Sequence, residues 1–274
     1  MNHTDLTGHS AEYDPHSTHS QRNSAISASA GILLPDDNRE RVLDSTVRPY
    51  AWIGKIDSVW PGGVTTSGTA TLLDQTDLLT CAHNFYNARK RHFCLSASFT
   101  PAAGPGKLRP FGTMPLTSWQ VPDLYKSSNA EMPGANGITA RDETRYLYDY
   151  AVARLGTRWR RDDPLFDIGW PGTETIQGAT CNIVGYSGDK DRSGWTQYLR
   201  TGHVAVDEGE QFVSYQMSSF PGDSGAAVYY KPTGRGFFRV IALHVSGVSG
   251  NFNFGTALTD EVVQHIQEMR DSLE

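Results

Sequence analysis

Short apolar runs separated by turn residues dominate the chain from Ile32 onwards. The runs at 52–56, 68–73 and 94–99 are bounded by glycine, proline, asparagine or aspartate. Apolar segments of this length between turn residues are typical of β-strands. In the second half, the same pattern predicts strands at 180–186, 202–207, 211–217, 226–230, 237–245 and 255–257. We therefore expect an all-β protein.

The end of the chain changes to a helical period. Thr259 can cap a helix whose first turn is acidic, and apolar side chains follow at Val262, Val263, Ile266, Met269 and Leu273. These spacings of three and four residues place the apolar side chains on one helix face. The pattern predicts a helix over 259–273, and we expect it to pack against the second half of the protein.

Two stretches lack any clear period. Residues 1–31 are rich in Ser, His, Asn and Thr and carry few bulky apolar side chains, which predicts a disordered, propeptide-like leader. The stretch from Pro101 to Arg145 is rich in Pro, Gly, Ser and Asn, and we expect it to be a long surface connection.

Composition narrows the classes of function. The chain has 274 residues, which suits one β unit or two packed β halves, and 27 glycines fit a protein rich in turns. A net charge of −6 argues against nucleic acid as a partner. No run of 18 apolar residues predicts a membrane span. The first residues lack a basic and then apolar signal peptide, so we expect a cytoplasmic protein, or a secreted one if a leader is missing.

The three cysteines, Cys81, Cys94 and Cys181, do not suggest a disulfide framework. We expect reduced, buried thiols, and a pair between Cys81 and Cys94 is the alternative. Their spacings lack the close pairs of a zinc site, and the histidines are scattered. We expect no metal and no cofactor.

Chemistry is concentrated in residues 221–228. Ser224 stands between Gly222-Asp223 and Gly225, directly before an apolar, strand-like run. Small neighbours allow a tight turn that presents the hydroxyl and lets backbone N–H groups converge beside it. An ordinary turn is the alternative interpretation of this segment.

Two further segments complete a set of catalytic groups. An apolar strand ends at His83, and Asp149 opens an alternating strand at 149–155. Asp142 and Asp189 are weaker candidates for the acid, because neither opens such a strand. The order His, Asp, Ser along the chain is that of chymotrypsin. The three segments resemble the catalytic blocks of chymotrypsin-like serine proteases.

Four more blocks resemble the bacterial glutamyl endopeptidase branch of that family. They are 34–39, 184–190, 199–204 and 242–247, and the resemblance extends from about residue 33 to the C-terminus. It implies a protease domain over 32–274. This domain would contain two antiparallel six-stranded β-barrels, at roughly 32–155 and 165–258, followed by the C-terminal helix.

The resemblance implies a role for each group. His83 would act as general base and Asp149 would orient its imidazole, so that Ser224 forms an acyl-enzyme. The backbone N–H groups of Gly222 and Ser224 would form the oxyanion hole. The substrates would be proteins or peptides.

The resemblance also implies that His244 and Ser219 face the primary pocket and determine which side chain it accepts. An imidazole and a hydroxyl can hydrogen-bond a carboxylate, so we expect cleavage after Glu and, more weakly, Asp. Ser218 stands where an acidic residue would favour Lys or Arg. A buried strand histidine is the alternative for His244.

Activation is suggested by Asp223. In trypsin-like zymogens the corresponding acid pairs with a newly cut amino terminus. We expect processing near Gly31 and Ile32 to release an amino terminus that pairs with Asp223 or lies near the substrate carboxylate. Capping of turn N–H groups is the alternative role for Asp223.

Two other functions stay open. One is a triad protease of broader specificity that needs leader removal or a regulatory partner, and the other is a catalytically idle module that binds peptides. The basic run 89–92 after His83 is expected to be a solvated turn rather than a recognition site.

Overall fold

The computed structural model describes residues 33–128, 145–161, 166–191, 194–248 and 252–273. The expected leader and Ile32 lie outside these residues. Within them, no helix is both long and apolar enough to cross a membrane. The cytoplasmic location stays a prediction.

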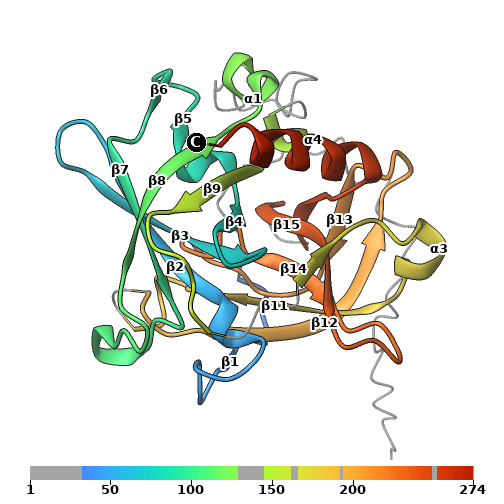
Figure 1. The fold of residues 1–274 in the computed structure, drawn as a ribbon. Helices are drawn as coiled ribbons and strands as arrows, with labels where there is room; N and C mark the ends of the chain where they lie inside the picture. The colour runs from blue at the N-terminus through green and yellow to red at the C-terminus, as the bar shows by residue number, and fades with distance from the viewer. Residues whose placement is uncertain (1–32, 129–144, 162–165, 192–193, 249–251, 274) are drawn as a thin grey trace, which may run out of the picture.

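Six antiparallel strands close the first barrel (Figure 1). They pair in the order β2-β3-β4-β9-β8-β7, and β7 returns to β2. Their bounds are β2 Ile53–Val59, β3 Thr65–Leu72, β4 Asp77–Thr80, β7 Ser96–Pro101, β8 Met114–Gln120 and β9 Ala151–Leu155. Closure leaves no free edge, so every strand finds a pairing partner on both sides.

A second set of six strands also closes on itself. The order is β11-β12-β13-β16-β15-β14, with β14 pairing back to β11. Their bounds are β11 Thr180–Gly185, β12 Tyr198–Val206, β13 Phe212–Tyr215, β14 Ala227–Tyr230, β15 Phe238–Val248 and β16 Phe252–Ala257. The predicted fold class, two six-stranded antiparallel barrels, is therefore confirmed.

Two short strands extend the second barrel. β1 (Glu40–Arg41) pairs with β12, and β10 (Phe166–Ile168) pairs with β15. β1 falls in the range that we assigned to the first barrel, yet it pairs with the second. The N-terminal segment is therefore held by the second barrel.

The expected connection from Pro101 to Arg145 contains regular structure, so that prediction was wrong over its first part. β8 lies within it, followed by the short helix α1 (Asp123–Ser127). β8 bridges β7 and β9, and the Trp119 ring stacks on Phe85 with centroids 5.3 Å apart. Barrel closure supplies the pairing partners that the sequence pattern alone did not reveal.

The remaining short elements lie in the connections between strands. They are the 3₁₀ turns η2 Tyr50–Trp52, η3 Ala82–Asn84 and η4 Pro105–Lys107, the hairpin strands β5 Tyr86–Asn87 and β6 His92–Phe93, and the helix α3 Thr173–Ile176. All three cysteines are free and buried, which confirms the expectation of reduced thiols.

The C-terminal helix α4 (Asp260–Asp271) begins as predicted, because Thr259 Oγ1 accepts a hydrogen bond from the Val262 N–H at 3.4 Å. The helix packs on β9 of the first barrel, not on the second barrel as we expected (Figure 1). Arg154 of β9 donates to the Leu273 carbonyl and so satisfies a group that the helix end leaves unpaired. This contact and the apolar face of α4 favour the first barrel.

Replacement of Ile266 by alanine tests this docking. Its side chain is fully buried in the main hydrophobic core, to which both barrels contribute. We expect Ile266→Ala to lower the free energy of unfolding by about 2–4 kcal/mol, because it leaves a cavity. Urea denaturation measures the change. Gln264→Ala, on the exposed face of the same helix, should change it by less than about 0.5 kcal/mol; equal effects of the two variants would contradict the packing.

Candidate active site

His83 and Asp149 form the central contact of the site. His83 lies on η3, which follows β4. Asp149 lies just before β9, with Tyr150 between them, and β9 pairs with β4. His83 Nδ1 lies 2.6 Å from Asp149 Oδ2, and the His83 backbone N–H donates to Asp149 Oδ1 at 3.0 Å. Asp149 is buried, whereas a quarter of the His83 side chain is exposed. The ring is therefore held through Nδ1, which leaves Nε2 as the nitrogen available to a reacting group.

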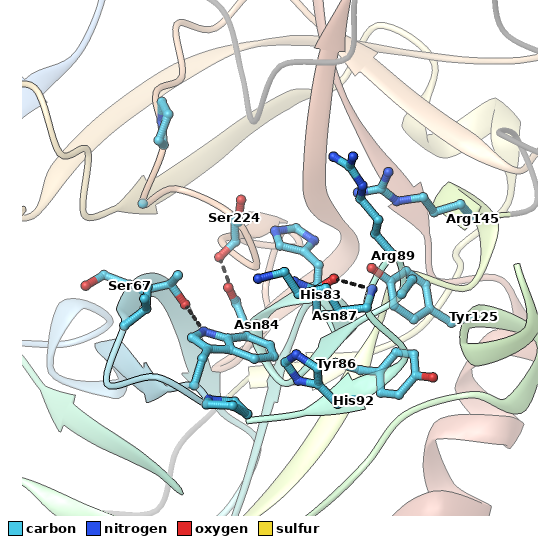
Figure 2. Close-up of a pocket in the computed structure, with 18 residues that line it drawn as sticks. Ser67, His83, Asn84, Tyr86, Asn87, Arg89, His92, Tyr125, Arg145 and Ser224 are labelled. Atoms are coloured by element: carbon cyan, nitrogen blue, oxygen red, sulfur yellow. Dashed lines mark hydrogen bonds between the residues drawn. The ribbon is translucent and has the colours of Figure 1, made fainter. Parts of the chain in front are cut away.

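Ser224 lies in the turn before β14 and borders the same cavity as His83 (Figure 2). Its backbone carbonyl accepts from the Thr69 N–H at 2.9 Å and from Asn84 Nδ2 at 3.2 Å. Both donors belong to the first barrel, and Asn84 adjoins His83. The two barrels therefore hold the serine and the histidine together.

The glycines on either side of Ser224 have conformations that other residues rarely adopt. Gly222 has φ = +108°, and a Cβ there would lie 2.3 Å from the Tyr186 carbonyl oxygen. Gly225 has φ = +85°, and a Cβ would lie 2.2 Å from Thr80 Oγ1. Only glycine fits these positions without displacement of the neighbours.

Two backbone donors stay available beside the hydroxyl. Among the described residues, the N–H groups of Gly222 and Ser224 donate to no acceptor, whereas the intervening Asp223 N–H donates to Phe220 at 3.0 Å. Unpaired N–H groups that flank a serine can bind an oxygen that gains negative charge. These two N–H groups are the ones predicted for the oxyanion hole, and that role stays a prediction.

Cys81 offers a different chemistry for the same place. In the described part of the chain, Cys81, His83 and Asp149 bring possible metal ligands within 4.8 Å of one another. Burial, with a contribution from Asp149, raises the pKa of the Cys81 thiol well above its usual range. The Cys81 thiol donates to the His244 carbonyl at 3.2 Å, so it has a partner within the chain.

The predicted specificity residues lie together in the second barrel. His244 Nε2 is 2.6 Å from Ser219 Oγ, and His244 Nδ1 is 2.7 Å from the Tyr215 hydroxyl. Burial raises the pKa of Tyr215 well above its usual range, so its hydroxyl stays protonated and can donate to Nδ1. The proton of a neutral His244 then resides on Nε2, which faces Ser219.

Asp223 has a partner that the sequence analysis missed. Arg200 of β12 places Nη2 2.6 Å from Asp223 Oδ2, and both side chains are buried. The same carboxylate accepts from Ser187 Oγ at 2.7 Å and from the Phe220 N–H at 3.0 Å. The last contact agrees with the alternative role, the capping of turn N–H groups.

The pKa of Asp223 reflects this environment. Burial alone would raise it, but the charge of Arg200 and the hydrogen bonds from Arg200 and Ser187 hold the pKa below its usual value. The carboxylate is therefore charged at neutral pH and already has a cation within the chain. Pairing with a new amino terminus is not required, and Ile32 lies outside the described residues.

The N-terminal segment contacts Ser218, which adjoins the predicted specificity residue Ser219. The Leu34 N–H donates to Ser218 Oγ at 3.1 Å. Asn38 accepts from the Ser218 N–H at 2.9 Å and donates to the Gln216 carbonyl at 3.2 Å. Arg39 then pairs with Asp189 at 2.7 Å, so this candidate for the catalytic acid has a structural partner instead. Asp142 lies outside the described residues.

The structure thus brings the sequence-predicted residues into two groups. His83, Gly222 and Ser224 line the cavity, with Asp149 bound to His83, and Ser219 contacts both His244 and Asp223. The sequence did not reveal the supporting residues Asn38, Thr69, Asn84, Arg200 and Tyr215. Asn38 and Arg200 lie within blocks that carry the family resemblance, which could have drawn attention to them.

Comparisons with known proteins place the fold. No family model and no curated protein matches the chain. A solved Glu endopeptidase matches with a TM-score of 0.67 and 25% identity, covering 88% of this chain and 100% of the other. A thermostable serine protease from an extremophilic microorganism matches with a TM-score of 0.58 and 18% identity, covering 80% and 97% of the two chains. An inactivated protease paralogue of the scabies mite matches with a TM-score of 0.57 and 15% identity, covering 81% and 96%.

Replacement of Arg200 tests its role. We expect Arg200→Met to lower the free energy of unfolding by about 3–5 kcal/mol at pH 7, because it leaves a buried carboxylate without a cation. The double variant Arg200→Met/Asp223→Asn should recover part of the loss. Denaturant titrations of all three proteins measure this, and an unchanged stability of Arg200→Met would contradict the assignment.

The decrease in the free energy of unfolding caused by Arg200→Met should depend on pH. In the wild type the lowered pKa of Asp223 adds stability that is present at neutral pH and is lost as the pH falls through that pKa. In Arg200→Met the buried carboxylate favours its protonated form, so its folded-state pKa is raised and its stability increases as the pH falls. The difference between the two proteins should therefore shrink from pH 7 to pH 4. A difference that grew on acidification would contradict this linkage.

Proposed function

We propose that this chain, whose fold and structural neighbours are those of chymotrypsin-like serine proteases, is an active serine endopeptidase. The observation that carries the proposal is the 2.6 Å contact between His83 Nδ1 and Asp149 Oδ2 at the cavity that Ser224 also borders. The two available N–H groups beside Ser224 add the site for an oxyanion.

The mechanism follows from these positions. His83 Nε2 accepts the Ser224 proton as Oγ attacks the substrate carbonyl, and the same proton is then given to the leaving amine. Asp149 keeps the ring in the required tautomer and stabilises its charged form. The N–H groups of Gly222 and Ser224 bind the oxyanion, and water then hydrolyses the acyl-enzyme in the reverse sense.

A catalytically idle module is the competing function. The match to an inactivated paralogue means that the fold alone carries no argument for activity. The argument for activity rests on the groups themselves. Peptide binding requires neither the buried Asp149 behind His83 nor the glycines with positive φ beside Ser224. Both features are present.

For specificity, we propose that a glutamate side chain binds at His244 and Ser219, and aspartate more weakly. The His244 Nε2 proton and the Ser219 hydroxyl now bond Ser219 and Asp223, and a substrate carboxylate would accept these two hydrogen bonds in their place. The 25% identity to a solved Glu endopeptidase agrees with this preference. Broader specificity is the alternative.

A peptide-library digest tests the catalytic proposal. Wild-type protein should cut peptides predominantly after Glu, with sites identified by mass spectrometry. Ser224→Ala should lose at least about 10⁴-fold in turnover, because the nucleophile is absent. Cleavage by Ser224→Ala at the wild-type rate would exclude the mechanism. Failure of wild-type protein to react with a serine-directed phosphonate would favour the idle module.

Paired substrates test the pocket. We expect His244→Ala to lower kcat/KM for a peptide with Glu before the bond by about 10- to 100-fold, because one hydrogen bond to a charged group is lost. The matched Gln peptide should lose far less. Tyr215→Phe keeps the ring but removes the hydroxyl at Nδ1, so it should reduce the Glu preference partially. A Glu-to-Gln ratio that His244→Ala leaves unchanged would contradict the assignment.

Processing near Ile32 is a second proposal, which one contact favours. The Leu34 N–H is bonded to Ser218, next to the primary pocket. An amino terminus two residues earlier would lie within about 7 Å of that nitrogen. Asp223 already pairs with Arg200. Of the two roles expected for the new amino terminus, we therefore favour the one in which its ammonium group lies near the substrate carboxylate.

Trimmed chains test the processing. We expect protein that begins at Ile32 to have a kcat/KM for a Glu peptide about tenfold above that of the intact chain, because an added positive charge assists the substrate carboxylate. A chain that begins one residue earlier, at Gly31, is the matched control and should gain less. Full activity of intact chain, verified by mass spectrometry, would contradict this proposal.

A further inference from the structure

A cavity of about 430 Å³ extends from the catalytic groups into a strongly basic region, and we name it the His83 cavity. It borders His83, Gly222 and Ser224. Its basic lining residues are Arg89, Lys90, His92 and Arg145, and no aspartate or glutamate stands among the described residues that line it. The cavity is therefore positive in a chain whose net charge is −6.

The basic residues come from a short hairpin that follows His83. Residues 88–91 form its turn between β5 and β6, and the Lys90 N–H donates to Asn87 Oδ1 at 2.9 Å. The rings of Tyr86 and Phe93 meet across its base with centroids 4.9 Å apart. The expected solvated turn is confirmed, since residues 89–91 are exposed, and the structure also places Arg89 and Lys90 on the wall of the cavity.

Within the part of the chain that the structure describes, the side chains of Arg89 and Lys90 form no ion pair and no hydrogen bond. Arg145 differs, because burial lowers its pKa while Tyr125 and Asp149 act in the opposite direction and prevail. Figure 2 shows Arg89 and Arg145 on the same side of the His83 ring in this view. Arg89 and Lys90 are the cations available to a ligand.

The His83 cavity does not include the predicted specificity residues. Neither Ser219 nor His244 lines it, whereas both catalytic side chains His83 and Ser224 do. A peptide whose bond lies at Ser224 must therefore pass beside this cavity with residues other than the one held by His244. Those residues flank the scissile bond.

We propose that the His83 cavity is a second acidic subsite, in which Arg89 and Lys90 bind an aspartate or glutamate side chain beside the residue that occupies the primary pocket. This proposal rests on the proposed function. The enzyme would then select bonds within acidic sequences, not every bond after a glutamate. Because Arg89 and Lys90 are exposed, their contribution is modest and falls with added salt.

Competition between peptides tests the subsite. Each peptide has Glu before the bond, and Glu or Lys replaces Ala at one of four positions: the residue before that Glu or the first three after the bond. Glu and Lys versions compete in one tube, so the ratio of their kcat/KM values does not depend on how much of the enzyme is folded. For wild type we expect a ratio of about 5 to 20 at one or more positions in low salt.

Variants of the turn provide the control. Arg89→Gln and Lys90→Gln should each reduce the ratio about threefold. Arg91→Gln removes the same charge from the same turn, but Arg91 does not line the cavity, so the ratio should stay unchanged. Equal losses in all three variants, or wild-type ratios near one at every position, would overturn the subsite and leave the protease intact. Absence of any peptide cleavage by wild type would instead contradict the proposed function.

Discussion

The buried ion pair between Arg200 and Asp223 is the contact on which the site most depends. Asp223 lies next to the nucleophile, and its Oδ2 also accepts from Ser219 Oγ at 3.3 Å. One carboxylate is thus joined to the turn that presents Ser224 and to the hydroxyl beside His244. Burial opposes the charged carboxylate, so the arrangement persists only while Arg200 compensates for the lost hydration. The same interaction therefore supports both the turn that carries Ser224 and the contact between Ser219 and His244.

The barrels contribute different parts of this arrangement. The second barrel carries Ser224 and the charge pair, while the first supplies Thr69 and Asn84, which bind the Ser224 carbonyl. A relative shift of the barrels would therefore disturb the serine and the histidine together. The helix α4 packs on β9, the first-barrel strand that follows Asp149, and so covers that strand. The relative position of His83 and Ser224 therefore depends on how the two barrels pack against each other.

Local chemistry could be predicted from the sequence, whereas distant partners could not. Ser224 and His83 stand in short segments whose turns and strands are visible in the sequence, and Asp149 opens a strand. Arg200 looks like any polar strand residue, because the carboxylate that explains its burial is 23 positions away. β8 was missed for a related reason: Pro115 and the surrounding polar residues obscure a strand that pairing with β7 and β9 stabilises. The docking side of α4 likewise depends on Arg154, a residue of another element.

The chain uses its cations in two physically distinct ways. Arg200 is dehydrated and fixed, so its charge determines the conformation of its surroundings and its removal leaves an unpaired charge. Arg89 and Lys90 are exposed and form no ion pair with the described residues, so they contribute little to folding and, in the proposed subsite, act on an approaching ligand. A net charge of −6 hides this division, because the acidic residues lie elsewhere. Hence the position of a cation, not the overall charge, indicates whether it organises the site or recruits a substrate.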